Sequence, residues 1–187
     1  MIHTAISALQ STLQIFINEA IGSLQHEVRL DNIAMVESPD SVDELKDKVI
    51  ISLVNIEEES ALKNGLHYKT SPANGLVRYE NPPVYLNLYI LFTVNFPRQY
   101  SDALRLLSFI IQCFQGKNQF QVNDEMQLSL DLYTMTFEQI NHLWGSLGGK
   151  QVPFVMYKAR LVRITDKRPL GTGPLIEEIQ GTVKAKL

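Results

Sequence analysis

The chain has very little cysteine and no long run of charge of one sign. Cys113 is the single cysteine among 187 residues, so no intramolecular disulfide can form, which suits a reducing compartment. It lies inside an apolar helical segment, where a thiol behaves as a small hydrophobic side chain. The 17 basic and 20 acidic residues give a net charge of -3 and are well mixed along the chain. This balance argues against nucleic acid or an anionic membrane as a partner.

The first 24 residues lack the features of a targeting or membrane-spanning segment. They are mildly apolar, but they carry neither a basic leader nor a small-residue cleavage site. Polar side chains also interrupt them at Gln10, Gln14, Asn18 and Glu19. We therefore expect neither a signal peptide nor insertion into a membrane.

Signatures of nucleotide and metal binding are equally scarce. The segment GSLGGK, residues 145–150, has the wrong glycine spacing for a phosphate-binding loop, and it ends a helix where such a loop would begin one. Cys113 has no motif partner, so a zinc site is not expected. The histidines are scattered, with no two at the spacing of metal ligands: His3, His26, His67 and His142. The sequence therefore predicts no metal and no cofactor.

Catalytic motifs are missing as well. Glu57, Glu58 and Glu59 are adjacent, whereas acid–base sites draw their carboxylates from separate elements, so we interpret these three as a solvated face. The chain has no Gly-x-Ser-x-Gly sequence, and no serine or cysteine is placed beside a histidine. We expect that the protein is not an enzyme.

What the chain does contain is clear hydrophobic periodicity. The segments 49–56 and 84–94 are apolar on both faces and rich in β-branched residues, which is typical of interior strands. A strand over 128–133 should be half-buried through Leu128, Leu130 and Leu132. The last strand, 154–164, alternates apolar residues with Lys158 and Arg160. Helical spacing predicts three helices, over residues 2–22, 101–116 and 137–147.

Two of these helices carry further predictions. In the second, we expect a buried stripe, widened by Leu106, Phe109 and Ile110, whose centre consists of Leu104, Leu107, Ile111 and Phe114. In the third, Thr136 and Gln139 form a capping box, and Gly148 with Gly149 ends the helix. Trp144 fits the core better than a binding anchor.

These elements predict an α+β fold resembling an α/β sandwich. Its sheet is expected to be mixed and largely antiparallel, with about four to five strands flanked by three helices. Residues 1–164 should form one domain, because a chain of this length with 45% hydrophobic residues supports a single core. Residues 165–187 would be a C-terminal extension or arm, which could add a strand to a neighbouring subunit or pack locally. The polar segment 37–48 should be an exposed connection, and 57–81 a long excursion suited to contact with a neighbour.

Three stretches also resemble one known family. They are VIISLVNIEEESALKNG at residues 49–65, NPPVYLNLYILFTVNFPRQYSDALRLLSFIIQCFQ at 81–115, and FEQINHLWGSLGGKQVPFVMYKARLV at 137–162. Their order and wording are similar to the N-terminal domain of the cap or tail-terminator proteins of phage-tail-like contractile injection systems.

This resemblance implies both a fold and a role. The fold would be that of phage tail terminators. The protein would form a homo-oligomer, a hexameric ring, on the distal end of the inner tube, where it stops tube growth and attaches the sheath. Its partners would be copies of itself, the inner tube protein and the sheath protein. It would reside in the cytoplasm during assembly and then in the injection particle.

We select five candidate partner-binding residues from the excursion 57–81 and the basic face of the last strand: Asn64, Arg78, Lys158, Arg160 and Arg163. For Lys158 and its basic neighbours, a solvated strand edge is an equally good interpretation.

Three other functions stay open at this stage. One is the tail-completion protein of an ordinary phage, and another is an adaptor that recruits effectors or links the tail to another component. A small hydrolase is the least favoured, because no convergent polar constellation can be assembled from the sequence.

Overall fold

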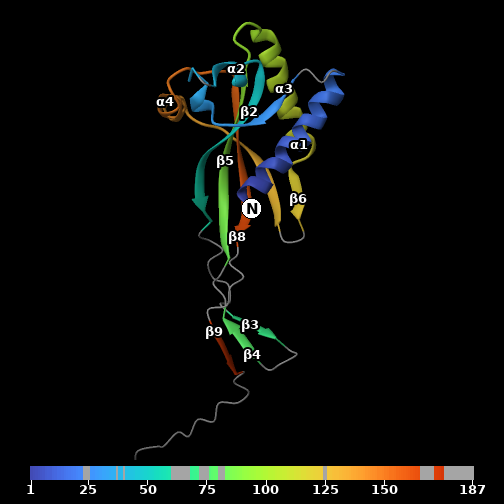
Figure 1. Ribbon diagram of the computed structural model, residues 1–187, viewed down its shortest axis with the longest axis vertical. Helices are drawn as coiled ribbons and strands as arrows, with labels where there is room; N and C mark the ends of the chain where they lie inside the picture. Colours follow the sequence, from blue (N-terminus) through green and yellow to red (C-terminus); the bar gives the residue numbers. More distant parts are fainter. Residues whose placement is uncertain are drawn as a thin grey trace, which may run out of the picture.

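The computed structural model describes residues 1–22, 26–36, 38–39, 41–59, 68–71, 76–79, 83–123, 126–164 and 171–174. For residues 68–71, 76–79, 126, 161–164 and 171–174 it describes the backbone only. Six strands form the main sheet, in the order β1-β2-β5-β8-β7-β6 (Figure 1). Their bounds are β1 Val28–Leu30, β2 Lys48–Glu58, β5 Val84–Asn95, β6 Gln119–Asn123, β7 Met126–Tyr133 and β8 Phe154–Ile164.

The predicted fold class is confirmed, with two more strands than the four that periodicity identified. Only β1 and β2 are parallel, and every other neighbouring pair is antiparallel. Periodicity missed β1 because it has three residues, and β6 because only Phe120 in it is fully buried. Strands this short give too few alternations to form a pattern.

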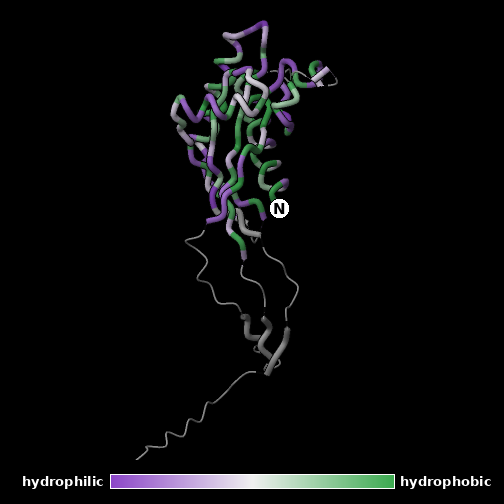
Figure 2. The backbone as a smooth tube through the Cα atoms, turned by 90° about the vertical axis from the view of Figure 1, so that its left-hand side faces the viewer, coloured by the Kyte–Doolittle hydropathy of each residue, from purple (hydrophilic) through white to green (hydrophobic). Residues whose placement is uncertain are grey.

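The helices lie on both faces of this sheet. Helices α1 (Ile2–Ile21) and α3 (Tyr100–Gly116) cover one face, whereas α4 (Phe137–Ser146), the four-residue α2 (Val42–Leu45) and the 3₁₀ turn Ile33–Met35 lie on the other (Figure 1). Figure 2 shows apolar stretches running through the strands and helix α1 of this body. The sheet is therefore the middle layer, and this explains why β5 is buried continuously from Asn87 to Asn95.

Strand β2 is only partly the interior strand that the sequence predicts. Its first half is buried, with Val49, Ile50 and Ile51 at 2% exposure or less. From Leu53 onward the strand is largely exposed, since β1 pairs with it only as far as Ile51. The predicted connection 37–48 contains α2, whose Leu45 is fully buried.

The buried stripe of α3 was predicted one step around the helix from where it lies. The buried residues are Ala103, Leu106, Ile110, Cys113 and Phe114. Leu104 and Ile111, expected at the centre of the stripe, are 44% and 40% exposed. Both candidate stripes have helical spacing, so periodicity alone does not show which of them is buried. The buried side of α3 is determined by its contacts with α1 and β5.

Helix α3 begins at Tyr100, one residue before the start that the sequence predicts, and the residue that precedes it is Gln99. In β7, Leu128 and Leu130 are buried as expected, but Leu132 is 56% exposed. Leu132 lies beyond the last residue of β7 that pairs with β6, so no neighbouring strand on that side shelters it. The predictions for α1 and α4 are confirmed, including the capping box at Thr136 and positive φ at Gly148 and Gly149.

A second, three-stranded antiparallel sheet lies within the regions predicted as excursion and extension. It consists of β3 (Tyr68–Ser71), β4 (Leu76–Tyr79) and β9 (Gly171–Pro174), in that order. Strand β4 pairs with β3 through residues 68–71 and with β9 through residues 171–174. The excursion and the extension thus meet in one small sheet, which Figure 1 draws below the main one.

Candidate interaction surfaces

A polar network crosses three strands on the α4 side of the main sheet. Tyr89 of β5 donates its hydroxyl to Glu57 of β2, with 2.6 Å between the oxygens. The Nζ atom of Lys158, in β8, lies 3.6 Å from the same carboxylate and 5.1 Å from the centre of the Tyr89 ring. Partial burial, and then the bond to Glu57, raise the pKa of Tyr89. The pKa of Lys158 is raised mainly by the hydrogen bond between Lys158 and Tyr89, so the ammonium group of Lys158 stays charged.

The second basic residue of β8 is also paired with an acid. Arg160 Nε lies 2.8 Å from Asp131 of β7, and both side chains are about half exposed, at 54% and 40%. An exposed pair of this kind contributes about 0–1 kcal/mol to folding. Lys158 and Arg160 therefore belong to a surface of mixed charge, because each has a carboxylate partner.

The other three candidate partner-binding residues are placed only in part. Arg78 lies in β4, opposite Lys69 of β3 and Thr172 of β9, and Arg163 lies in β8, opposite Tyr85 of β5. Their side chains, and the whole of Asn64, fall outside the described residues. The structure brings Lys158 and Arg160 together on one strand, and their binding role stays a prediction.

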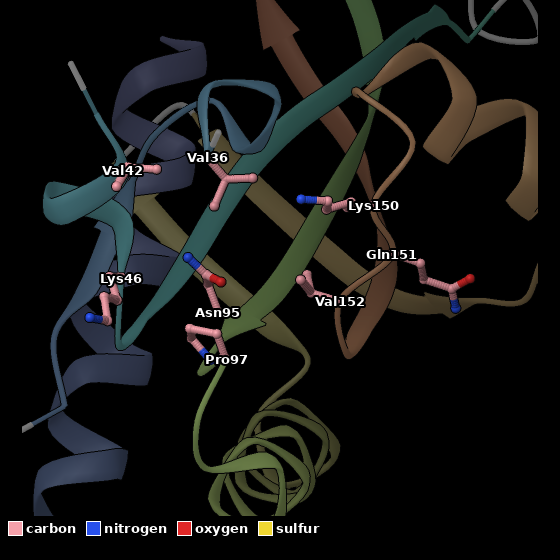
Figure 3. Close-up of a pocket in the computed structure, with 8 residues that line it drawn as sticks. All are labelled: Val36, Val42, Lys46, Asn95, Pro97, Lys150, Gln151 and Val152. Atoms are coloured by element: carbon pink, nitrogen blue, oxygen red, sulfur yellow. The ribbon is translucent and has the colours of Figure 1, made fainter. Parts of the chain in front are cut away.

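A hollow lies where β5 ends and the connection from α4 to β8 passes (Figure 3). Its volume is about 720 Å³. In Figure 3, Val36, Asn95, Lys150 and Val152 surround the hollow, whereas Gln151 points away from it. Asn95 is held in place because its Nδ2 donates to the carbonyl of Leu45 over 2.8 Å. The lining residues are Val36, Val42, Lys46, Asn95, Pro97, Lys150, Gln151 and Val152.

The described lining of this hollow includes no carboxylate, imidazole, thiol or hydroxyl side chain, and its ionisable groups are the amines of Lys46 and Lys150. Nowhere in the described part of the chain do three histidine, cysteine, aspartate or glutamate side chains converge to hold a metal ion. The described helices also include none long and apolar enough to cross a membrane.

Sequence reasoning missed the exposed second half of β2. Beside it, Val54, Asn55 and Glu57 of β2 line a smaller hollow of about 220 Å³ together with Tyr133 and Met135 from the end of β7 and the turn that follows. Its remaining lining residues are Tyr89, Gln139, Leu143 and Met156. A β-bulge interrupts the register with β5 between Leu53 and Asn55. The run Glu57–Glu59 was the sequence signal that could have indicated this exposure, since the end of a strand that carries three acidic residues is rarely buried.

Several large apolar side chains are exposed at other places. Phe137, at the start of α4, is 87% exposed, and Tyr100, at the start of α3, is 64% exposed. Leu104 and Ile111 follow Tyr100 along the outer side of α3. Scattered apolar residues are normal on a monomer, but a row on one helix is a candidate contact surface.

Comparisons with known proteins address the whole chain. A family model for the Pvc16 N-terminal domain matches residues 5–178. Among solved structures, the sheath/tube terminator of PVC, an extracellular contractile injection system, in its extended state, aligns with 100% of this chain at a TM-score of 0.71 and 14% identity. The tube-terminating cap of the anti-feeding prophage aligns with 96% of this chain at a TM-score of 0.68 and 16% identity. This chain spans 64% and 60% of the lengths of those two proteins. No curated protein sequence matches it significantly.

Proposed function

Because the chain belongs to the Pvc16 N-terminal domain family, we propose that it is a structural cap of a contractile injection system. In this role it ends polymerisation of the inner tube and attaches the sheath at the distal end. The observation that carries the proposal is the similarity of its whole fold to a sheath/tube terminator and to a tube-terminating cap.

The described surfaces support a role in assembly. The core is a buried sheet between two layers of helices, which makes a rigid block. Around it lie an exposed half-strand, a row of apolar residues on α3 and a network of mixed charge. A terminator needs such surfaces for tube, sheath and neighbouring subunits, and it needs no catalytic site. We therefore propose that the protein is not an enzyme.

The form of the cap is a homo-oligomeric ring. Copies related by one repeated heterologous contact close into a ring when the rotation suits, and six copies would match a sixfold tube. Residues 1–164 would form the cap domain, and residues 165–187 an arm of that domain. Asn64, Arg78, Lys158, Arg160 and Arg163 are proposed contact residues. Assembly would take place in the cytoplasm, with the inner tube and sheath proteins as partners.

This function can be tested by imaging particles that are assembled with the protein and particles that are assembled without it. We expect particles that lack it to have tubes of irregular length or a ragged distal end, and restored ends when the protein is supplied again. Particles that keep normal tube length and a normal distal end without it would overturn the proposal. If the ends are normal but cargo is lost, the protein is an adaptor instead.

A further inference from the structure

Helix α3 carries an apolar row on its outer side. Tyr100, Leu104 and Ile111 are 64%, 44% and 40% exposed. Leu107 is half-buried and completes the row. Positions 100, 104, 107 and 111 follow the alternating spacing that places side chains on one side of a helix, and this spacing is typical of a helix that packs against a partner.

A hollow of about 480 Å³ lies beside this row, and we call it the α3 groove. One wall comes from α3 and the other from residues 151–154, which lead into β8. The lining residues are Tyr100, Leu104, Leu107, Gln151, Val152, Pro153 and Phe154, and all except Gln151 are apolar. The groove can therefore hold a large apolar side chain, and Tyr100 and Phe154 offer it aromatic partners.

Phe137 is a side chain that suits this groove. It is the first residue of α4 and is 87% exposed. The capping box holds the backbone on both sides of Phe137. The Oγ1 atom of Thr136 accepts from the N–H of Gln139 over 3.3 Å, and the Oε1 atom of Gln139 accepts from the N–H of Thr136 over 2.9 Å. Because the backbone is already fixed, less conformational entropy is lost when the phenyl group binds.

The charges near the groove are opposite to those at the start of α4. Arg98 and Arg105 are exposed just before α3 and within its first two turns, whereas Asp102 between them is half-buried. On α4, Glu138 is 84% exposed and lies 3.8 Å from His142, which is 80% exposed. An exposed pair of this kind is weak, so the carboxylate can also face an arginine of another molecule. Opposite charges beside an apolar contact fix its register.

We propose that Phe137 of one copy of this chain enters the α3 groove of the next copy, with Glu138 directed toward Arg105 beside the groove. The inference rests on the proposed function, because a ring of subunits supplies the neighbouring copy, and it names the surfaces that join them. A second copy is the favoured occupant, since this chain itself carries both the aromatic side chain and the groove, and both of the opposite charges.

The positions of the two surfaces suit a ring. Helices α3 and α4 cover opposite faces of the main sheet (Figure 1). A contact between them joins two different surfaces, so it is heterologous and can repeat from copy to copy until the ring closes. Each subunit then uses its α4 toward one neighbour and its α3 toward the other.

The first test measures self-association of the intact protein by analytical ultracentrifugation at concentrations up to about 1 mM. We expect the wild type to associate. Phe137→Ala and Leu104→Glu should each weaken association about thirtyfold, because the first removes the buried anchor and the second places an acid in the groove against Glu138. The matched control is Leu132→Glu, because Leu132 is 56% exposed but lies in β7, outside the groove.

Circular dichroism and thermal unfolding of the three variants show whether each keeps the fold, and either of the two contact variants suffices for the test. A wild type that stays monomeric at the highest concentration overturns the proposal. Association that the control weakens as much as the contact variants do overturns it as well.

The second test mixes the two contact variants. The Phe137→Ala chain keeps an intact groove, and the Leu104→Glu chain keeps an intact Phe137, so a mixture can form one contact between unlike chains and no further one. We expect native mass spectrometry to show each variant alone as a monomer and the mixture as a one-to-one heterodimer. Dimers of either variant alone would mean an isologous contact. That result, or a mixture that stays monomeric, overturns the proposal.

A charge reversal tests the pairing of Glu138 with Arg105. Glu138→Arg and Arg105→Glu should each weaken association about fivefold, since each places like charges together. The double variant should recover most of the wild-type association, because the opposite charges are exchanged between the two surfaces. Losses that simply add in the double variant would overturn this register of the contact.

These tests separate the contact from the cap role. If the heterodimer forms but particles lacking the protein keep normal ends, the contact stands and the cap role fails. If particles need the protein but the mixture stays monomeric, the cap role stands and the subunits join through other surfaces.

Discussion

Phe92 shows how single residues hold the core together. It is fully buried in β5, and its ring lies 5.1 Å from that of Phe114 on α3 and 5.6 Å from that of Tyr157 on β8. Phe92→Ala should lower the free energy of unfolding by about 3–5 kcal/mol, because it removes these contacts and leaves a cavity. Urea denaturation followed by fluorescence measures this change.

Phe137 provides the matched control, because it has the same side chain at 87% exposure. Phe137→Ala should change the free energy of unfolding by less than about 0.5 kcal/mol. Equal losses in the two variants would contradict the described positions of these rings.

Cys113 makes the free energy of unfolding depend on pH in the alkaline range. Burial raises the pKa of its thiol from 9.0 to about 11, an effect that nearby Lys117 offsets only in part. Below pH 9 the thiol is protonated in both states, so its contribution to stability is fully present. Between about pH 9 and 11 the unfolded chain releases a proton that the folded chain retains, and the free energy of unfolding falls as pH rises.

The measurement is denaturation of the wild type and of Cys113→Ala between pH 8 and pH 10. We expect the wild type to lose stability more steeply above pH 9. The variant should begin its decline later, from groups such as Tyr157, whose pKa burial raises to about 12. Parallel curves would show that the thiol is not buried.

At the scale of elements, α1 does more than cover the sheet. Its residues Gln10 and Gln14 look like the polar face of an amphipathic helix, but they hydrogen-bond the backbone of Val28 in β1 and of His26 just before that strand. Gln14→Met keeps the length of the side chain and leaves the N–H of Val28 and the carbonyl of His26 without this partner. We expect a loss of about 1–3 kcal/mol in the free energy of unfolding.

The same substitution at Gln112, on the exposed outer side of α3, should change the free energy of unfolding by less than about 0.5 kcal/mol. Thermal unfolding of the two variants side by side makes the comparison. A smaller loss for Gln14→Met than for Gln112→Met would mean that the glutamines do not hold β1.

Some elements could be predicted from the sequence and others could not, for physical reasons. Strand β8 and helix α4 were predicted within a residue or two, because alternation and a capping box are local signals. The buried side of α3 depends on what packs against it, so Leu104 and Ile111 were misplaced. Strands β1 and β9 are each too short to give a pattern and exist through their partners β2 and β4.

The candidate surfaces were harder to predict than the fold. Lys158 and Arg160 were found as a basic face, but the sequence could not show that Glu57 and Asp131, far away along the chain, neutralise them. Leu53 and Ile56 of β2 were predicted to lie in an interior strand but are exposed, because exposure of an apolar strand depends on how far its neighbours extend. Which side chains are exposed depends on where the neighbouring elements end, and hydrophobic periodicity within one element does not show this.

At the scale of the whole molecule, the described body around the main sheet is a packed block with distinct surfaces on different sides. The exposed second half of β2, the apolar row on α3 and the charged network are not related to one another by any internal repeat. A contact that joins two different surfaces is heterologous, and its repetition produces a closed ring or an open filament. A terminator requires the closed form, since an open one would continue to grow.

The central claim is that this protein caps the end of a tube, and locating it on the particle tests that claim most directly. Electron cryomicroscopy of intact particles that carry a tagged copy of the chain would show where it resides. We expect a closed ring of copies with this fold at the distal end and no copies along the tube. Copies spread along the tube or sheath, or a distal end built without this fold, would contradict the claim.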